Sequence, residues 1–167
     1  MQKHIISLLV DNEPGVLARV AGLFSGRGFN IESLCVAETL DPAVSRITLV
    51  TRGDEAIAEQ IKKQLNKLIN VIKVYDLTGT EYVGREMALV KVKAKADYRA
   101  EILRIVDIFR CKVIDVSPTH YTIEVTGTAE KLGAILSLLK PLGIKEIART
   151  GAIALAREKK DRGGARS

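Results

Sequence analysis

The residues of this chain best suited to chemistry lie in the segment Asp11-Asn12-Glu13-Pro14-Gly15-Val16-Leu17, and the chemistry they suit is the binding of a small carboxylate. Proline fits the first turn of a helix because its backbone angle is already fixed and its missing N–H would have no partner there. The glycine after it lets a ligand approach the backbone. Free amides of Gly15, Val16 and Leu17, together with the positive end of the helix dipole, would hold a carboxylate, and Asn12 would add a directed amide.

A second segment, Arg27-Gly28-Phe29-Asn30-Ile31, follows at the expected end of the same helix. Both segments also have purely structural interpretations. Asn12 or Glu13 would serve as a helix cap, with the Pro-Gly pair as a turn, and Asn30 would suit a loop because asparagine tolerates unusual backbone angles. The residues alone leave these alternatives open.

Other chemical constellations are missing from the sequence. It contains no Ser-His-Asp set, no phosphate-binding P-loop and no dinucleotide-binding glycine pattern. The two cysteines and two histidines are not spaced like metal ligands, so no metal site is expected at Cys35, Cys111, His4 or His120. The chain is therefore predicted to bind a ligand and not to catalyse a reaction.

Hydrophobic periodicity predicts the elements that position the two segments. The inward face of the first helix is expected to comprise Val16, Leu17, Val20, Leu23 and Phe24. The first half should contain, in order, a strand over 3–10, a helix from Pro14 that stops at Gly26 and Gly28, strands over 31–38 and 46–51, a helix capped by Asp54, and a strand over 71–77.

The second half repeats this order after a link near 78–81. It should contain, in order, a strand over 87–95, a helix from Asp97, strands over 112–116 and 121–126, a helix capped by Thr128, and a strand over 144–149 that continues at 153–156. The fold class is therefore α+β, with two tandem ferredoxin-like βαββαβ units, each a four-stranded antiparallel sheet with two helices on one face. The other face of each sheet would expose apolar side chains, so pairing with a second copy or a partner protein is expected.

Composition narrows the class of protein. The chain has 167 residues, 47% of them hydrophobic, and no apolar run long enough to span a bilayer, so a cytoplasmic protein that does not bind membranes is expected. Half of the net charge of +6 lies in Arg157–Ser167, and residues 158–167 are expected to form a disordered basic tail. Only 4% of the residues are aromatic, and the central strands contain none that could stack on bases, so nucleic-acid binding is not expected.

An acylphosphatase would share the expected topology, and Arg19-Val20-Ala21-Gly22-Leu23-Phe24 superficially resembles the Arg-Val-Gln-Gly-Val-Phe run of that family. That chemistry needs its arginine in a phosphate-binding loop before the helix. Here Arg19 falls inside the expected helix, so an exposed charge on a solvated face is the preferred interpretation.

Many segments resemble the small regulatory subunit of acetolactate (acetohydroxyacid) synthase, an ACT-domain family, in one colinear match over about residues 3–157. The segments that carry this resemblance are Asn12-Glu13-Pro14-Gly15-Val16-Leu17-Ala18-Arg19-Val20, Gly22-Leu23-Phe24, Arg27-Gly28-Phe29-Asn30-Ile31-Glu32-Ser33-Leu34, Ser45-Arg46, Gln64-Leu65-Asn66-Lys67-Leu68, Arg85-Glu86-Met87-Ala88-Leu89-Val90-Lys91, Phe109-Arg110 and Ile114-Asp115-Val116. The resemblance implies an ACT effector-binding domain over 1–78, a linker over 79–84 and a C-terminal ferredoxin-like domain over 85–157.

The resemblance also implies a function. Such subunits bind the large catalytic subunit of acetolactate synthase, raise its activity and make it sensitive to feedback inhibition by valine or another branched-chain amino acid. They form homodimers through their ACT domains, and thiamine diphosphate, magnesium and FAD are expected only on the catalytic partner. The effector site would comprise Asn12, Gly15, Val16 and Leu17 of one chain with Asn30 and Ile31 of the other. A free-standing ACT-type amino-acid sensor with a different partner remains the alternative.

Overall fold

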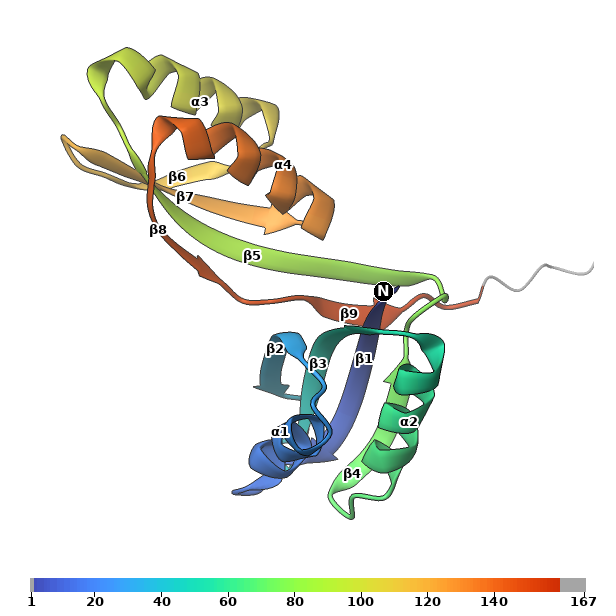
Figure 1. The fold of residues 1–167 in the computed structure, drawn as a ribbon. Coiled ribbons are helices and arrows are strands. Elements are labelled where there is room, and N and C mark those ends of the chain that lie inside the picture. The colour runs from blue at the N-terminus through green and yellow to red at the C-terminus, as the bar shows by residue number, and fades with distance from the viewer. Residues whose placement is uncertain (1, 160–167) are drawn as a thin grey trace, which may run out of the picture.

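The computed structural model describes residues 2–159 and consists of two units joined through one long strand (Figure 1). The first unit comprises β1 (Gln2–Asp11), α1 (Val16–Gly26), β2 (Ile31–Glu38), β3 (Val44–Gly53), α2 (Glu55–Asn66) and β4 (Val71–Asp76). The second comprises β5 (Tyr82–Lys93), a 3₁₀ turn (Ala96–Tyr98), α3 (Arg99–Ile108), β6 (Lys112–Val116), β7 (His120–Gly127), α4 (Ala129–Leu139), a second 3₁₀ turn (Lys140–Leu142) and β8 (Ile144–Arg149), followed by β9 (Ile153–Ala156).

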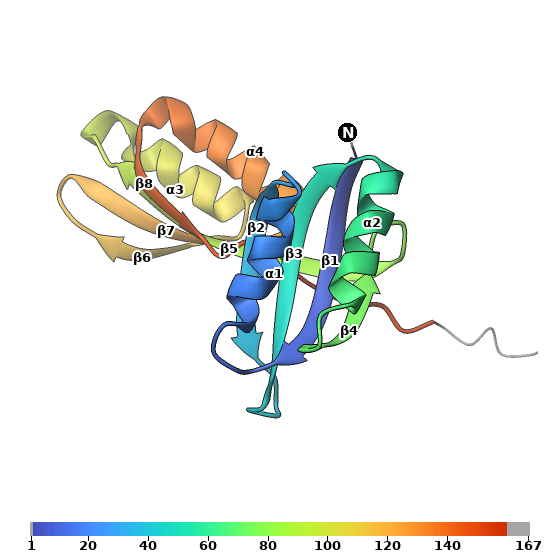
Figure 2. The same ribbon diagram turned by 60° about the horizontal axis from the view of Figure 1, so that its bottom comes forward.

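The strand orders confirm the predicted fold class. The first sheet has the order β2-β3-β1-β4 and the second the order β6-β7-β5-β8, with every pair antiparallel. Two helices cover one face of each sheet (Figures 1 and 2). The second sheet differs from the expected four strands in one respect, because β9 also pairs with β5.

Each unit has a hydrophobic core of its own between its sheet and its helices. In the first unit, Ile6, Leu8 and Val10 alternate along β1 and are fully or almost fully buried under α1 and α2. In the second, Val90 and Val92 of β5 take the same place under α3 and α4. The cores therefore form as the period-two pattern of the central strands predicts.

The expected inward face of α1 is wrong at one residue. Val16, Val20, Leu23 and Phe24 are buried, but the side chain of Leu17 is 42% exposed. Successive helix residues point about 100° apart, so Leu17 cannot share the centre of the face that Val16 and Val20 occupy.

A two-stranded ribbon links the units and covers part of the helix-free face of the first sheet. It consists of the first four residues of β5, Tyr82–Arg85, paired with β9, and the expected linker over 79–84 therefore already belongs to a strand from residue 82. Ala154 of β9 packs against Ile5, Val50 and Leu77 on that face. Figure 1 shows β9 and the start of β5 lying across the end of the first sheet.

Two helix caps predicted from the sequence are present. The Asp54 carboxylate accepts a hydrogen bond from the Ile57 amide at 2.8 Å, and the Thr128 hydroxyl accepts one from the Lys131 amide at 3.3 Å. We expect Asp54→Ala and Thr128→Ala each to lower the free energy of unfolding by about 1 kcal/mol, because a first-turn amide loses its acceptor. Urea titration would measure this loss, and Asp107→Ala in the last turn of α3 is the control, with an expected change below about 0.5 kcal/mol.

An ion pair between α2 and β4 predicts a loss of stability in acid. The Lys62 ammonium lies 3.0 Å from the Asp76 carboxylate. Burial alone would raise the pKa of Asp76, but hydrogen bonds from Lys62 and Thr78 outweigh it and hold this pKa below its usual 3.8. The stabilisation is therefore complete above about pH 3.8 and disappears as the pH falls through the lower pKa of the folded state.

The measurement is the difference in free energy of unfolding between the wild type and Asp76→Asn as a function of pH. We expect a difference of about 1 kcal/mol at neutral pH that shrinks toward zero in acid. A difference that stays constant down to about pH 2 would contradict the assignment of this stability to the carboxylate.

None of the helices within residues 2–159 is both long and apolar enough to cross a membrane. Of the expected basic tail over 158–167, residues 160–167 lie outside the described part of the chain. Glu158 and Lys159 are exposed and belong to no helix or strand.

Candidate ligand-binding site

The N-cap of α1 is neither Asn12 nor Glu13, the two caps that the sequence suggested. The helix begins at Val16, two residues later than predicted from Pro14, and its N-cap is Gly15 at φ 85° with no side-chain cap. The alternative in which Asn12 or Glu13 caps the helix is therefore wrong. A φ of 85° is a left-handed conformation that favours glycine, so Gly15 is required by the backbone itself.

The backbone at this helix start leaves donors available for an anion. The Val16 amide donates to the Glu13 carbonyl at 3.4 Å, whereas the amides of Gly15 and Leu17 donate to no acceptor among residues 2–159. The Val16 side chain is buried in the core, so this residue offers only its backbone to the site. The side chain of Leu17 at the same helix start is exposed and is therefore available for an apolar contact.

Asn12 connects the loop to the far end of the β2–β3 hairpin. Its Nδ2 donates to the Pro42 carbonyl at 2.8 Å and to the Glu38 carboxylate at 3.3 Å. The Asn12 Oδ1 accepts no hydrogen bond from any described residue and is free for a ligand. No local signal in the sequence reveals the contact between Glu38 and Asn12, because 26 residues separate the two.

Asn30 and Ile31 lie at the opposite end of α1. The helix has 11 residues, so its length of about 16 Å separates them from Gly15 within one chain (Figure 2). The Asn30 carbonyl accepts a hydrogen bond from the Thr51 hydroxyl at 2.6 Å, which fixes the start of β2. The left-handed conformation in this loop belongs to Gly28, at φ 69°, so Asn30 is not needed for an unusual backbone angle.

Arg19 lies inside α1, near its start, and the preferred interpretation of the sequence also placed it inside the helix. Its guanidinium donates to the Asn70 side chain and is exposed. The chain therefore does not place Arg19 in a phosphate-binding loop before the helix. No cluster of three or more histidine, cysteine or acidic residues that could hold a metal ion occurs within residues 2–159.

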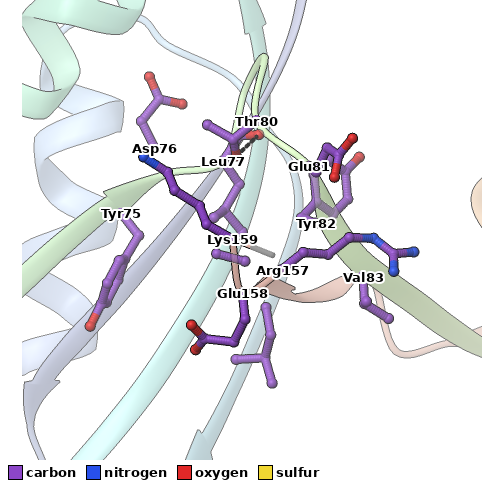
Figure 3. A pocket seen from close by; sticks show the side chains of 12 residues that line it. Tyr75, Asp76, Leu77, Thr80, Glu81, Tyr82, Val83, Arg157, Glu158 and Lys159 are labelled. Carbon is purple, nitrogen blue, oxygen red and sulfur yellow. Dashed lines mark hydrogen bonds between the residues drawn. The ribbon is translucent and has the colours of Figure 1, made fainter. Parts of the chain in front are cut away.

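A cavity of about 1680 Å³ lies elsewhere, between the end of β4 and the ribbon. Figure 3 shows Tyr75 and Asp76 on one side of it and Tyr82 and Val83 on the other, with charged side chains around the opening. None of the six predicted ligand-binding residues lines this cavity. The candidate site remains the surface formed by Asn12 and the Gly15–Leu17 turn, which lies apart from this cavity.

Comparison with known proteins decides the family. A model of the AHAS small subunit-like ACT domain matches residues 6–73, and a model of the small subunit of acetolactate synthase matches residues 85–158. The chain belongs to the acetolactate synthase small-subunit family.

Relatives in this family match over almost the whole chain. The acetolactate synthase small subunit of Aquifex aeolicus is 54% identical over 95% of this chain and 83% of its own length. That of Mycolicibacterium smegmatis is 50% identical over 98% of this chain and 96% of its own length. The crystal structure of the acetolactate synthase small subunit from Thermotoga maritima superposes with a TM-score of 0.87, at 44% identity, over 95% of this chain and 99% of that one. The matches to this family therefore extend over both units of the chain.

Proposed function

We propose that this acetolactate synthase small subunit activates the large catalytic subunit and makes it sensitive to valine or a related branched-chain amino acid. Membership of the family supports a large-subunit partner. The catalytic chemistry and its thiamine diphosphate, magnesium and FAD then belong to that partner, and this chain acts as a non-catalytic regulator. The observation that carries the effector part of the proposal is the hydrogen bond between Asn12 and Glu38.

This hydrogen bond predicts how two copies complete one site. It places Asn12 beside the last residue of β2, while Asn30 and Ile31 lie at the beginning of β2. Because β2 is an edge strand, a second copy can pair with it in antiparallel fashion across a twofold axis. The end of one β2 then faces the beginning of the other, so Asn12 of one chain approaches Asn30 and Ile31 of its partner.

The chemistry of this composite site suits an α-amino acid. The free amides of Gly15 and Leu17 would bind the carboxylate at the positive end of α1. The Asn12 Oδ1 would accept from the ammonium group, and Glu38 adds a negative charge 3.3 Å from the same side-chain amide. Leu17 and Ile31 would contact a branched aliphatic side chain.

An effector bound across two chains can regulate because it contacts both. It favours the arrangement of the dimer in which the two halves of the site fit it best, and this arrangement shifts the catalytic partner toward a less active state. A coupling free energy of about 1 to 3 kcal/mol is enough for feedback control of this kind.

The test is acetolactate formation by the cognate large subunit, with and without this chain, across a valine titration. Activation together with new inhibition by valine is the expected result. Activation without a response to valine would retain the partner and reject valine as the effector. No effect on the large subunit would contradict the proposal and favour a free-standing amino-acid sensor.

A further inference from the structure

An apolar groove lies on the helix-free face of the first sheet, on the β2 side of the ribbon. Its floor is formed by Cys35, Ala37 and Thr48 of β2 and β3, and its wall by Val83, Ile153 and Leu155 of the ribbon. It encloses about 650 Å³, and none of the six predicted effector-binding residues lines it, although Glu38, which contacts Asn12, does. The groove is therefore a neighbouring surface of the same unit that meets the proposed effector site at Glu38.

The wall of the groove exposes large apolar side chains. The side chains of Val83, Ile153 and Leu155 are 40%, 54% and 58% exposed. Val83 and Leu155 are directly paired across the ribbon, and Ile153 pairs with Arg85, the next residue on the same face, so the three form one continuous surface. A contiguous exposed apolar surface of this kind is typical of a protein-binding site.

The charges at the groove indicate what kind of segment it fits. Arg46 and Arg85 both line it, and neither forms an ion pair with an acidic side chain within residues 2–159. Arg46 donates to the Ser7 hydroxyl at 2.7 Å and lies over the Tyr75 ring, and Arg85 donates to the Gly84 carbonyl. Glu38 is the single acidic residue of the lining, so the groove has a net charge of +1.

This positive charge argues against a second copy as the occupant. A symmetric contact between two such grooves would bring Arg46 and Arg85 against their own equivalents. A one-way contact between the groove and a different surface of another copy would be heterologous, and such a contact closes only into a ring or extends as a filament. The occupant that fits is a segment of another protein with apolar side chains and a carboxylate.

The groove is also physically connected to the proposed effector site. Glu38 lines the groove and accepts the hydrogen bond from Asn12, so one side chain contacts both surfaces. An effector that draws Asn12 or Glu38 toward its ammonium group would change the charge and shape of the groove edge. A partner held in the groove would therefore bind differently in the presence of the effector.

We propose that this groove is a docking site for the large catalytic subunit, and that it binds an apolar segment of that subunit that carries an acidic side chain. This inference rests on the proposed function, because it assumes that the large subunit is the partner. Arg46 and Arg85 pair with the carboxylate, and the wall formed by Val83, Ile153 and Leu155 contacts the apolar side chains.

The test measures the concentration of small subunit that gives half-maximal activation of the purified large subunit. Leu155→Asp and Arg85→Glu should each raise this concentration tenfold or more, the first through the apolar wall and the second through charge. The matched controls are Ile108→Asp and Lys145→Glu, at exposed positions of the second unit outside the groove. Each should leave the concentration for half-maximal activation within about twofold of the wild-type value. Thermal unfolding and light scattering of each variant report folding and mass.

The outcomes separate the docking site from the proposed function. If the wild type activates and folded Leu155→Asp and Arg85→Glu activate at the wild-type concentration, the groove is not the docking site. A fall in the mass of these variants to that of a smaller oligomer would instead show that the groove lies between copies of this chain, and would also overturn the proposal. If the wild type itself neither binds nor activates the large subunit, the proposed function fails and the docking site with it.

Discussion

Asn12→Ala should raise the valine concentration needed for half-maximal inhibition by about 10 to 100-fold while leaving activation of the large subunit intact. The reason is the loss of the Oδ1 acceptor for the effector ammonium, since a hydrogen bond to a charged group contributes about 1.5 to 3 kcal/mol. The substitution also removes the donors to Pro42 and Glu38, which hold the hairpin beside the site. Inhibition curves of the reconstituted enzyme measure the first effect.

A matched asparagine separates this effect from a general loss of stability. Asn66 lies at the end of α2, and its Nδ2 donates to the Lys62 carbonyl at 3.0 Å, away from the site. Asn66→Ala should leave the inhibition curve unchanged. Asn30→Ala should reproduce the effect of Asn12→Ala, because the proposed site takes one residue from each chain. An unchanged response to valine in both Asn12→Ala and Asn30→Ala would show that the effector binds elsewhere.

Leu8→Ala should lower the free energy of unfolding of the first unit by about 2 to 5 kcal/mol. Leu8 is completely buried on the central strand β1, beside Ile47 of β3 and under the helices, and the smaller side chain would leave a cavity there. This loss of stability is large for a single substitution, because a central strand between two others cannot easily move to fill the space. Denaturant titration followed by circular dichroism would measure it.

The same chemical change at an exposed leucine is the control. Leu40 lies in the turn between β2 and β3, and its side chain is fully exposed. Leu40→Ala should change the free energy of unfolding by less than about 0.5 kcal/mol. Because the two units have separate cores, Leu8→Ala should shift the transition of the first unit more than that of the second. Equal shifts in both would contradict this independence.

The bounds of three short strands were predicted correctly at both ends. The strands over 31–38, 112–116 and 144–149 have the bounds that the sequence indicates, and each lies next to a glycine, a proline or a loop residue. The helix caps at Asp54 and Thr128 were also predicted correctly, because capping depends on contacts within three residues. Local physics therefore determined these parts of the fold.

The parts that the sequence did not reveal depend on distant residues. The start of β5 at Tyr82 was missed because Gly84 interrupts the run and because the strand pairs there with β9, some seventy residues later. The hydrogen bond between Asn12 and Glu38 was missed for the same reason, because it joins residues that are 26 positions apart. In the candidate site, the loop itself was predicted, but the helix begins later because Gly15 adopts a left-handed conformation.

The packing of Ala154 against Ile5 also has a consequence for how the molecule is made. A ribosome produces β1, β3 and β4 long before β9, so the first unit can form its core under α1 and α2 while Ile5, Val50 and Leu77 still lack their cover. Only translation of the segment Ile153–Ala156 supplies Ala154, which covers these three residues. During synthesis the nascent first unit therefore carries an apolar surface that is open to chaperones, and completion of the ribbon is a late, long-range folding step.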